Sequence, residues 1–298
     1  MNENPTVLCV LGMHRSGTSA IAKGIESWSV SLGDQLIGAG PDNPRGYWED
    51  HEVVAINQIL LERCNLRWNE ARLLSREEVL AAADAGLVQR ATTLFQDRCE
   101  SWGLWGFKDP RTLRTLPFWL EVADTAGIEL RFLWALRHPA EVVASLAARN
   151  AMDPIRSQFM WAAHWLPFLS LLQGRKNAVL RFSELFQDPA TALHSIALCL
   201  GYEIREELLP SYQKEFLQAS LHHHHCPDDT DLLAPIARLY QALNAIHLTP
   251  SAAFWEQWQS LYSDFSVWGP VCALLDQETD WRRRRRGRLW KLTHGKIH

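Results

Sequence analysis

The sequence predicts an α/β protein in which helices cover both faces of a parallel sheet. Short, continuously apolar segments alternate with segments of helical periodicity, which is the pattern of such sheets. The first apolar segment is followed directly by a Gly- and Ser-containing turn and then by a helical pattern. The chain has 298 residues, of which 47% are hydrophobic and 21% are charged. A chain of this length buries a full core, and the composition excludes a disordered protein and a membrane bundle.

The predicted strands are residues 6–11, 104–107, 130–136 and 178–182. The first consists of β-branched and aliphatic side chains, and the third is a continuous apolar run, as expected of strands buried on both faces. Asp109-Pro110 ends the second strand, and a turn over residues 174–177 precedes the fourth. A loop is predicted over residues 38–46, which are rich in Gly and Pro.

Apolar residues at helical spacing predict helices over residues 19–28, 51–63, 77–95, 140–149 and 161–172. Pro139 stands where a helix favours its first residue, directly after the third strand. Beyond Gly201 we expect helices up to Leu217 and over residues 231–246, with no clear strand signal. The C-terminal third is therefore predicted to be more helical than the rest.

The charge is divided unevenly along the chain. The formal net charge is −4, yet residues 281–298 contain six Arg and two Lys and no acidic residue, which leaves 22 basic and 34 acidic residues in 1–280. We expect one domain over residues 1–280 and a basic tail over residues 281–298. A solvated tail is the simplest interpretation; an anionic membrane surface, an acidic ligand and an anion-binding site of the domain itself are the alternatives for its partner.

The turn after the first strand, GMHRSGTS at residues 12–19, has the context of a phosphate-binding loop. Its glycines permit a tight turn, and backbone N–H groups at a helix start converge on an anion. The nucleotide-triphosphatase pattern GxxxxGK[ST] requires a lysine where this chain has Thr18, and a cation stands inside the loop instead, at Arg15. The alternative interpretation is an ordinary turn between a strand and a helix.

A second anion site is predicted at the end of the third strand. Arg137 leaves the carboxyl edge of the sheet, where ligands of open α/β sheets bind, and Ser145 follows eight residues later, about two turns into the next helix. A guanidinium and a hydroxyl in this arrangement can hold one phosphate. The alternative is that Arg137 pairs with a carboxylate and Ser145 only packs on a helix face.

Together these motifs resemble those of sulfotransferases that use 3′-phosphoadenosine 5′-phosphosulfate (PAPS), in the version found in bacterial and Golgi-type members. The resemblance implies a P-loop-like three-layer fold. It implies that the loop binds the donor's 5′-phosphosulfate and that the strand-end motif binds its 3′-phosphate. The implied donor-binding residues are Arg15, Ser16, Gly17, Thr18, Ser19, Arg137 and Ser145.

Three further segments are similar to this family. Residues 43–49 match NP[KR]GY[FW]E, and residues 107–111 contain KDPR. Residues 181–185, with Asp188-Pro189, are similar to the late strand-and-loop motif, from which Phe182 and Ser183 depart. The resemblance extends over about residues 6–189.

The resemblance also implies a mechanism in which the sulfuryl group passes to an acceptor hydroxyl. Glu49 is the expected general base, Lys108 is expected to steady the transferred group, and Arg15 replaces the loop lysine of cytosolic members. Sulfuryl transfer can proceed on side-chain cations, so no metal is expected. Glu49 stands at a predicted helix start, which would weaken it as a base, and His51 is the alternative. The alternative for Lys108 is a surface salt bridge with Asp109.

We therefore expect an enzyme that transfers a sulfuryl group from PAPS to a hydroxyl of a carbohydrate, glycolipid or other small acceptor, with no nucleic-acid partner. A P-loop kinase and an inactive nucleotide-binding module are the alternatives. Scattered cysteines and the lack of a signal-like N-terminus favour a cytoplasmic protein. The run 222–225 of four His, followed by Cys226, is expected to be a solvated loop, because consecutive side chains do not converge on one metal.

Overall fold

The computed structural model describes residues 5–40, 43, 46–217 and 232–277. Its centre is a parallel sheet of four strands in the order β2-β1-β3-β4. The strands are β1 (Thr6–Leu11), β2 (Trp105–Lys108), β3 (Glu129–Leu136) and β4 (Asn177–Arg181). All four were predicted from the sequence to within one residue at each end.

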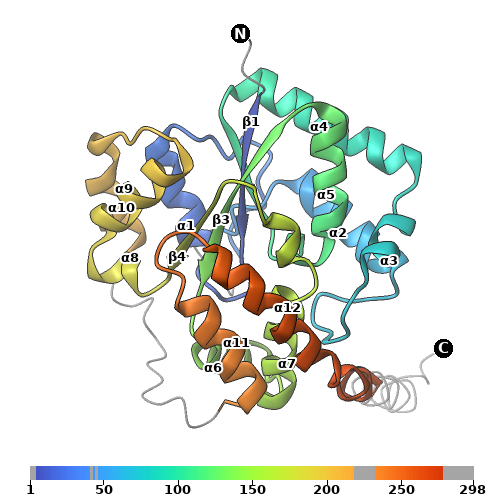
Figure 1. Ribbon diagram of the computed structural model, residues 1–298. Coiled ribbons are helices and arrows are strands. Elements are labelled where there is room, and N and C mark those ends of the chain that lie inside the picture. The colour runs from blue at the N-terminus through green and yellow to red at the C-terminus, as the bar shows by residue number, and fades with distance from the viewer. Residues whose placement is uncertain (1–4, 41–42, 44–45, 218–231, 278–298) are drawn as a thin grey trace, which may run out of the picture.

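Helices cover both faces of the sheet and make the fold a three-layer α/β structure (Figure 1). One face carries α1 (Thr18–Gly24), a 3₁₀ helix (Ile25–Trp28), α8 (Glu184–Gln187), α9 (Pro189–Leu200) and α10 (Leu209–Phe216). The other face and its lower end carry α2 (His51–Arg63), α3 (Arg76–Ala81), α4 (Ala85–Trp102), α5 (Thr112–Ala126), α6 (Pro139–Asn150), α7 (Pro154–Trp165), α11 (Ala234–Asn244) and α12 (Ala252–Ser266).

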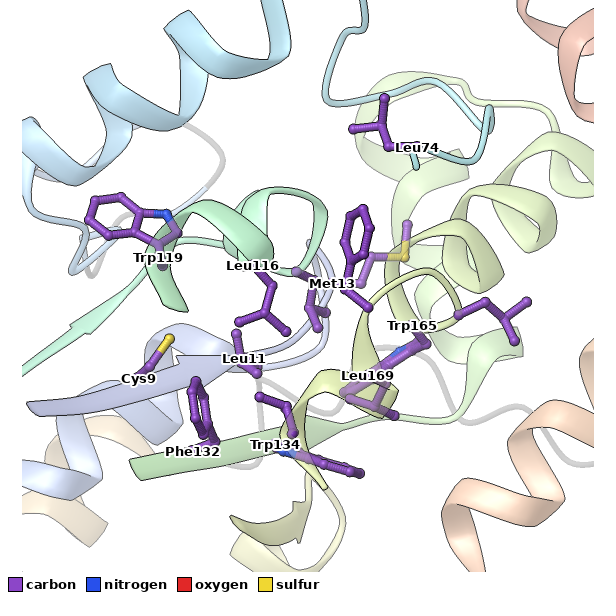
Figure 2. Packing of buried hydrophobic residues seen from close by; sticks show 14 of the residues in the cluster. Cys9, Leu11, Met13, Leu74, Leu116, Trp119, Phe132, Trp134, Trp165 and Leu169 are labelled. Carbon is purple, nitrogen blue, oxygen red and sulfur yellow. The ribbon is translucent and has the colours of Figure 1, made fainter. Parts of the chain in front are cut away.

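The alternation of side chains along the buried strands divides the core in two. Leu8 and Val10 of β1 face the layer of α1 and α9, and Cys9 and Leu11 face the layer of α2 and α5. The core on the side of α2 and α5 is the larger of the two and contains many Trp side chains. Figure 2 shows Trp119 of α5, Trp134 of β3 and Trp165 of α7 in it. The sheet is therefore rigid on both sides, and its strand ends are fixed in space.

Several predicted helices have different bounds in the structure. The predicted helix over residues 77–95 is two helices, because Asp84 caps α4 by accepting a hydrogen bond from the Leu87 N–H (2.8 Å). The predicted helix over residues 161–172 is α7 followed by a separate 3₁₀ turn (Leu169–Leu172). The helix α5 was not predicted, because Pro110 and Pro117 interrupt its pattern, and α12 was not predicted either.

The strand register brings the loops that carry the predicted motifs to one edge. Val10 pairs with Lys108, and Leu136 pairs with Arg181. The loop after β1, the end of β2, Arg137 after β3 and Phe182 after β4 therefore leave the carboxyl edge side by side, where α/β sheets bind ligands. After β4 the described residues form helices only, as predicted. In the part of the chain that the structure describes, no helix combines the length and apolar character needed to cross a bilayer.

Candidate active site

A pocket of about 410 Å³ opens at this edge of the sheet, a size within the range of small-molecule sites. Its walls come from the loop after β1, residues 43–49, the ends of β2 and β3, and single side chains of more distant segments. The cationic side chains that line it are Arg15, Lys108, Arg111, Arg137 and Arg149, and its acidic side chain is Glu49. The pocket is thus cationic although residues 1–280 are acidic overall.

The loop after β1 is a tight turn that requires glycine. Gly17 has φ 80°, in the left-handed region, and a Cβ placed there would lie 2.0 Å from the ring of Phe182. Arg15 is also left-handed, with φ 69°. The Ser16 side chain is fully buried, and its hydroxyl has no hydrogen-bond partner in the described structure. A buried, unsatisfied hydroxyl in such a loop is a donor suited to an anionic ligand.

Arg15 joins the two predicted anion sites, a contact that the sequence analysis did not predict. Arg15 Nε donates to Ser145 Oγ at 2.8 Å across 130 residues of chain, and Arg137 Nη1 donates to the Arg15 carbonyl at 3.0 Å. Arg137 also forms an ion pair with Glu141 at 2.7 Å and lies 4.4 Å from the Phe182 ring centroid. The carboxylate pairing that the sequence left as an alternative is therefore present, but Ser145 bonds to Arg15 rather than only packing.

Lys108 is buried at the floor of the pocket. Its ammonium donates to Glu49 Oε1 at 2.7 Å, to the Tyr47 carbonyl at 2.8 Å and to Ser19 Oγ at 3.3 Å. The side chain is 2% exposed. The alternative of a surface salt bridge with Asp109 is wrong, because Lys108 pairs with Glu49 from a segment 59 residues away.

Glu49 is not part of the helix that follows it. Asp50 is the N-cap of α2 and accepts from the Glu52 and Val53 N–H groups, so the helix end acts on Asp50. Burial raises the pKa of Glu49 above its ordinary value, and this effect exceeds the opposing effect of Lys108. The expected weakening of Glu49 by a helix start is therefore not the dominant influence. Trp48, directly before it, has φ 58°, a left-handed conformation that is strained for an aromatic residue.

A buried hydrogen-bond network holds the two segments that meet at Glu49 and Lys108. Asn57 of α2 is fully buried and donates to Asp109 Oδ2 (2.8 Å) and Thr112 Oγ1 (3.1 Å). Its carbonyl oxygen accepts from Thr115 (2.5 Å) and from the Trp119 indole (2.8 Å).

Asp109 connects this hydrogen-bond network to Arg111 in the pocket. Its carboxylate accepts from the Arg111 backbone at 2.9 Å and from the Arg111 guanidinium at 2.8 Å, and that guanidinium lies 3.6 Å from Glu49. Asp109 therefore fixes a second cation beside Glu49. Arg111 was part of the KDPR segment in the sequence, but no role was predicted for it.

The structure also brings His14 and Trp68 into the pocket, which the sequence analysis did not predict. Their rings lie 4.6 Å apart between centroids. His14 belongs to the predicted loop, so its position was visible in the motif, whereas Trp68 lies in a segment without any motif. The alternative base His51 is exposed at the first residue of α2.

Potential metal ligands and cysteines are the remaining features of the described residues. These residues contain no group of three or more His, Cys, Asp or Glu side chains that could hold a metal. The run 222–226 and the basic tail 281–298 lie outside the described residues. The cysteines that the structure describes, Cys9, Cys64, Cys99, Cys199 and Cys272, form no disulfide.

No family model matches the sequence, and no curated protein matches it. Among solved structures, one similar chain is the sulfotransferase domain of the Synechococcus PCC 7002 olefin synthase. It is 18% identical, with a TM-score of 0.46, and the alignment covers 89% of this chain and 96% of that chain. Similarity at this level says nothing about the reaction, so the residues of the pocket must carry the functional proposal.

Proposed function

We propose that this protein is a PAPS-dependent sulfotransferase that transfers a sulfuryl group to a hydroxyl of a carbohydrate, glycolipid or other small acceptor. One observation carries the proposal. Arg15, Lys108 and Arg137, which follow or end three different strands, line one pocket at the carboxyl edge of the sheet. Three cations from separate strands fit a ligand with more than one anionic group.

The donor fits this arrangement by its chemistry. PAPS has a phosphosulfate at one end and a separate 3′-phosphate, and the pocket with its immediate surroundings offers two sets of groups. Arg137 lines the pocket, and with Ser145, which is buried and accepts from Arg15, it forms the set for the 3′-phosphate. Lys108 lines the pocket and suits the phosphosulfate together with Ser16, which is buried in the loop after β1; Arg15 lies between the two sets. The unsatisfied buried hydroxyl of Ser16 gains a partner when an anion binds, which favours binding.

The proposed reaction needs a base and a cation, and the pocket provides them in contact. The donor supplies an activated sulfuryl group, whose bond to the phosphate oxygen breaks as a new S–O bond forms to the acceptor oxygen. Glu49 accepts the hydroxyl proton, and 3′,5′-ADP leaves. Lys108 and Arg15 stabilise the negative charge that develops on the leaving phosphate.

The ion pair between Glu49 and Lys108 suggests how the base becomes active. Lys108 lowers the pKa of Glu49, whereas burial raises it. A donor that offers Lys108 anionic oxygens competes with Glu49 for the ammonium. Glu49 then loses part of the charge that stabilises its carboxylate and becomes a stronger base. Donor binding would therefore prepare the site for the acceptor.

A transfer assay tests the proposal. The purified protein is incubated with [³⁵S]PAPS or with [γ-³²P]ATP and Mg²⁺, each with the same panel of hydroxyl compounds. We expect label transfer and 3′,5′-ADP formation from PAPS without added metal. Transfer from ATP alone would establish a kinase instead. Tight 3′,5′-ADP binding without transfer to any compound would indicate an inactive nucleotide-binding module.

A further inference from the structure

Two consecutive residues of the loop after β1, His14 and Arg15, contact different walls of the pocket. The left-handed turn at Arg15 directs its side chain to Ser145 of α6. The preceding residue, His14, instead packs against Trp68 and lies 5.9 Å from the ring of His164 of α7. The Arg15 side belongs to the proposed donor site, and the proposed donor chemistry leaves the His14 side unused.

His14 is a neutral hydrogen-bonding group in a cationic part of the pocket. Burial, followed by the charges of Arg111, His164, Lys108 and Arg149, holds the pKa of His14 well below its ordinary value. A neutral imidazole has one N–H donor and one nitrogen acceptor. Nε2 of His14 is buried and has no hydrogen-bond partner in the described structure. The ring therefore keeps hydrogen-bonding capacity that the protein does not use.

Trp68 gives this wall an aromatic face on a firmly held segment. Arg156 donates through Nε (3.1 Å) and Nη2 (2.6 Å) to the Asn69 carbonyl. Asp276, near the C-terminal end of the described chain, accepts from the Ala71 and Arg72 N–H groups at 2.9 Å each. These contacts hold the backbone directly after Trp68 in place before any ligand arrives, which is what a preorganised binding wall requires.

The charges around His14 restrict what can bind there. Lys108, Arg111 and Arg149 are the cations that disfavour a proton on His14, and they disfavour an ammonium group at the same place. An acceptor amine would have to lose its positive charge, by giving up a proton, before binding, whereas an alcohol is uncharged in its ordinary form. An indole face beside a neutral imidazole suits a ring whose apolar face packs on the indole and whose hydroxyl bonds to the imidazole.

We propose that His14 and Trp68 form the acceptor subsite, and that it takes an uncharged, hydroxyl-bearing sugar ring rather than an amine-bearing one. This inference rests on the proposed sulfotransferase activity, because it places the acceptor beside Glu49 and Lys108 in the same pocket. His14 would hold the acceptor hydroxyl by a hydrogen bond, and Trp68 would carry the sugar face. Neither residue would be needed for the donor.

The test uses three substitutions at two positions, with matched controls. His14→Phe keeps a flat ring and removes both nitrogens, and His14→Gln places an amide near the position of Nε2, the nitrogen that has no partner in the described structure. Trp68→Ala removes the indole. The controls are His194→Phe on α9, where the side chain is 57% exposed, and Trp102→Ala at the end of α4, where the residue is 40% exposed. Each variant is titrated with 3′,5′-ADP and assayed with PAPS and a sugar acceptor.

The acceptor probes are methyl β-D-glucopyranoside and methyl 2-amino-2-deoxy-β-D-glucopyranoside, which differ by one amino group. We expect the amino sugar to be used at least about tenfold less well below neutral pH, where its amine is protonated. His14→Phe and Trp68→Ala should each lower kcat/KM for the glucoside about tenfold to a hundredfold, mainly through KM, with 3′,5′-ADP affinity unchanged. His14→Gln should recover part of the loss, and the controls should match the wild type.

The outcomes separate this inference from the proposed function. Failure of the wild-type protein to bind 3′,5′-ADP would overturn the sulfotransferase proposal and the subsite with it. Donor binding with equal use of both sugars, or with transfer to neither, would overturn the assignment of the acceptor class. Normal kcat/KM in His14→Phe and Trp68→Ala would overturn the subsite alone. Weakened 3′,5′-ADP binding in these variants would assign the wall to the donor instead.

Discussion

Replacing Glu49 by Gln tests the proposed base with little change of shape. The amide oxygen can still accept a hydrogen bond from Lys108, which also keeps the Tyr47 carbonyl at 2.8 Å and Ser19 Oγ at 3.3 Å. Arg111 keeps its partner Asp109 at 2.8 Å. The substitution therefore removes a charge and a proton acceptor while the surrounding side chains retain hydrogen-bond partners.

The expected magnitudes follow from these contacts. A positioned general base contributes about 10²- to 10⁴-fold to the rate, or about 3 to 5 kcal/mol of transition-state stabilisation. Removing one member of a buried ion pair typically costs about 3–5 kcal/mol of folding free energy. The loss in Glu49→Gln should be smaller, about 1–3 kcal/mol, because Lys108 remains hydrogen-bonded. Activity should thus fall far more than stability does.

The assay compares sulfuryl transfer from PAPS with 3′,5′-ADP affinity and with urea unfolding in the wild type and Glu49→Gln. We expect a large loss of turnover, near-normal 3′,5′-ADP binding and a folded protein. Turnover within about threefold of the wild type, with normal folding, would remove Glu49 from the mechanism. The same experiment on His51→Gln serves as a control, because His51 is exposed at the start of α2.

The pH dependence of activity and of stability provides a second test of Glu49. Burial raises the pKa of Glu49 above 4.5, so kcat/KM should rise with pH along a limb that lies above the ordinary carboxyl range. The free energy of unfolding should depend on pH in the opposite direction. Folding favours the protonated form, so this contribution is present at low pH and is lost as the pH rises through the raised pKa. The free energy of unfolding of the wild type, relative to Glu49→Gln, should therefore decrease with increasing pH.

Three further predictions concern the support of the site. Asn57→Ala removes the partner of Asp109 Oδ2 and of the Trp119 indole N–H and should cost about 2–4 kcal/mol in urea unfolding; a loss below about 1 kcal/mol would show that the network is not needed. Gly17→Ala should be destabilising and should abolish 3′,5′-ADP binding, because its Cβ meets the Phe182 ring at 2.0 Å; normal binding would contradict the close approach. Deleting residues 281–298 should leave 3′,5′-ADP affinity and transfer to a soluble acceptor unchanged, and lost donor binding would place the tail at the active site.

The sheet was predictable because strands buried on both faces leave a continuous apolar signal. The apolar composition of residues 6–11 and 130–136 is enough to predict two strands. Because the strands are parallel, the loops that follow them must lie at the same carboxyl edge of the sheet. Helix α5 was missed because Pro117 lies inside it, where local rules predict a break. Its buried face packs on the core, and this burial outweighs the local cost of the proline.

The candidate site was predictable where a motif is local in the chain. Arg15, Arg137 and Ser145 were each visible beside a strand end, and the structure brings them together. The pairing of Lys108 with Glu49 was not visible, because burial and the fold of residues 43–50 decide it. The raised pKa of Glu49 likewise depends on burial, which a sequence pattern does not report.

Trp68 shows a further limit of local patterns. Its segment has no motif, and its position is set by Arg156 and Asp276, which lie far away in the sequence. A wall assembled from such distant contacts appears only in the folded chain.

The most direct measurement of the central claim is a calorimetric titration with 3′,5′-ADP and, separately, with Mg-ATP. The titrations use the wild type, Arg137→Ala and Arg90→Ala, a control in which the removed Arg is 41% exposed on α4. The proposed function predicts tight, magnesium-independent binding of 3′,5′-ADP that is lost in Arg137→Ala and kept in Arg90→Ala. A preference for Mg-ATP, or 3′,5′-ADP affinity that does not depend on Arg137, would contradict it.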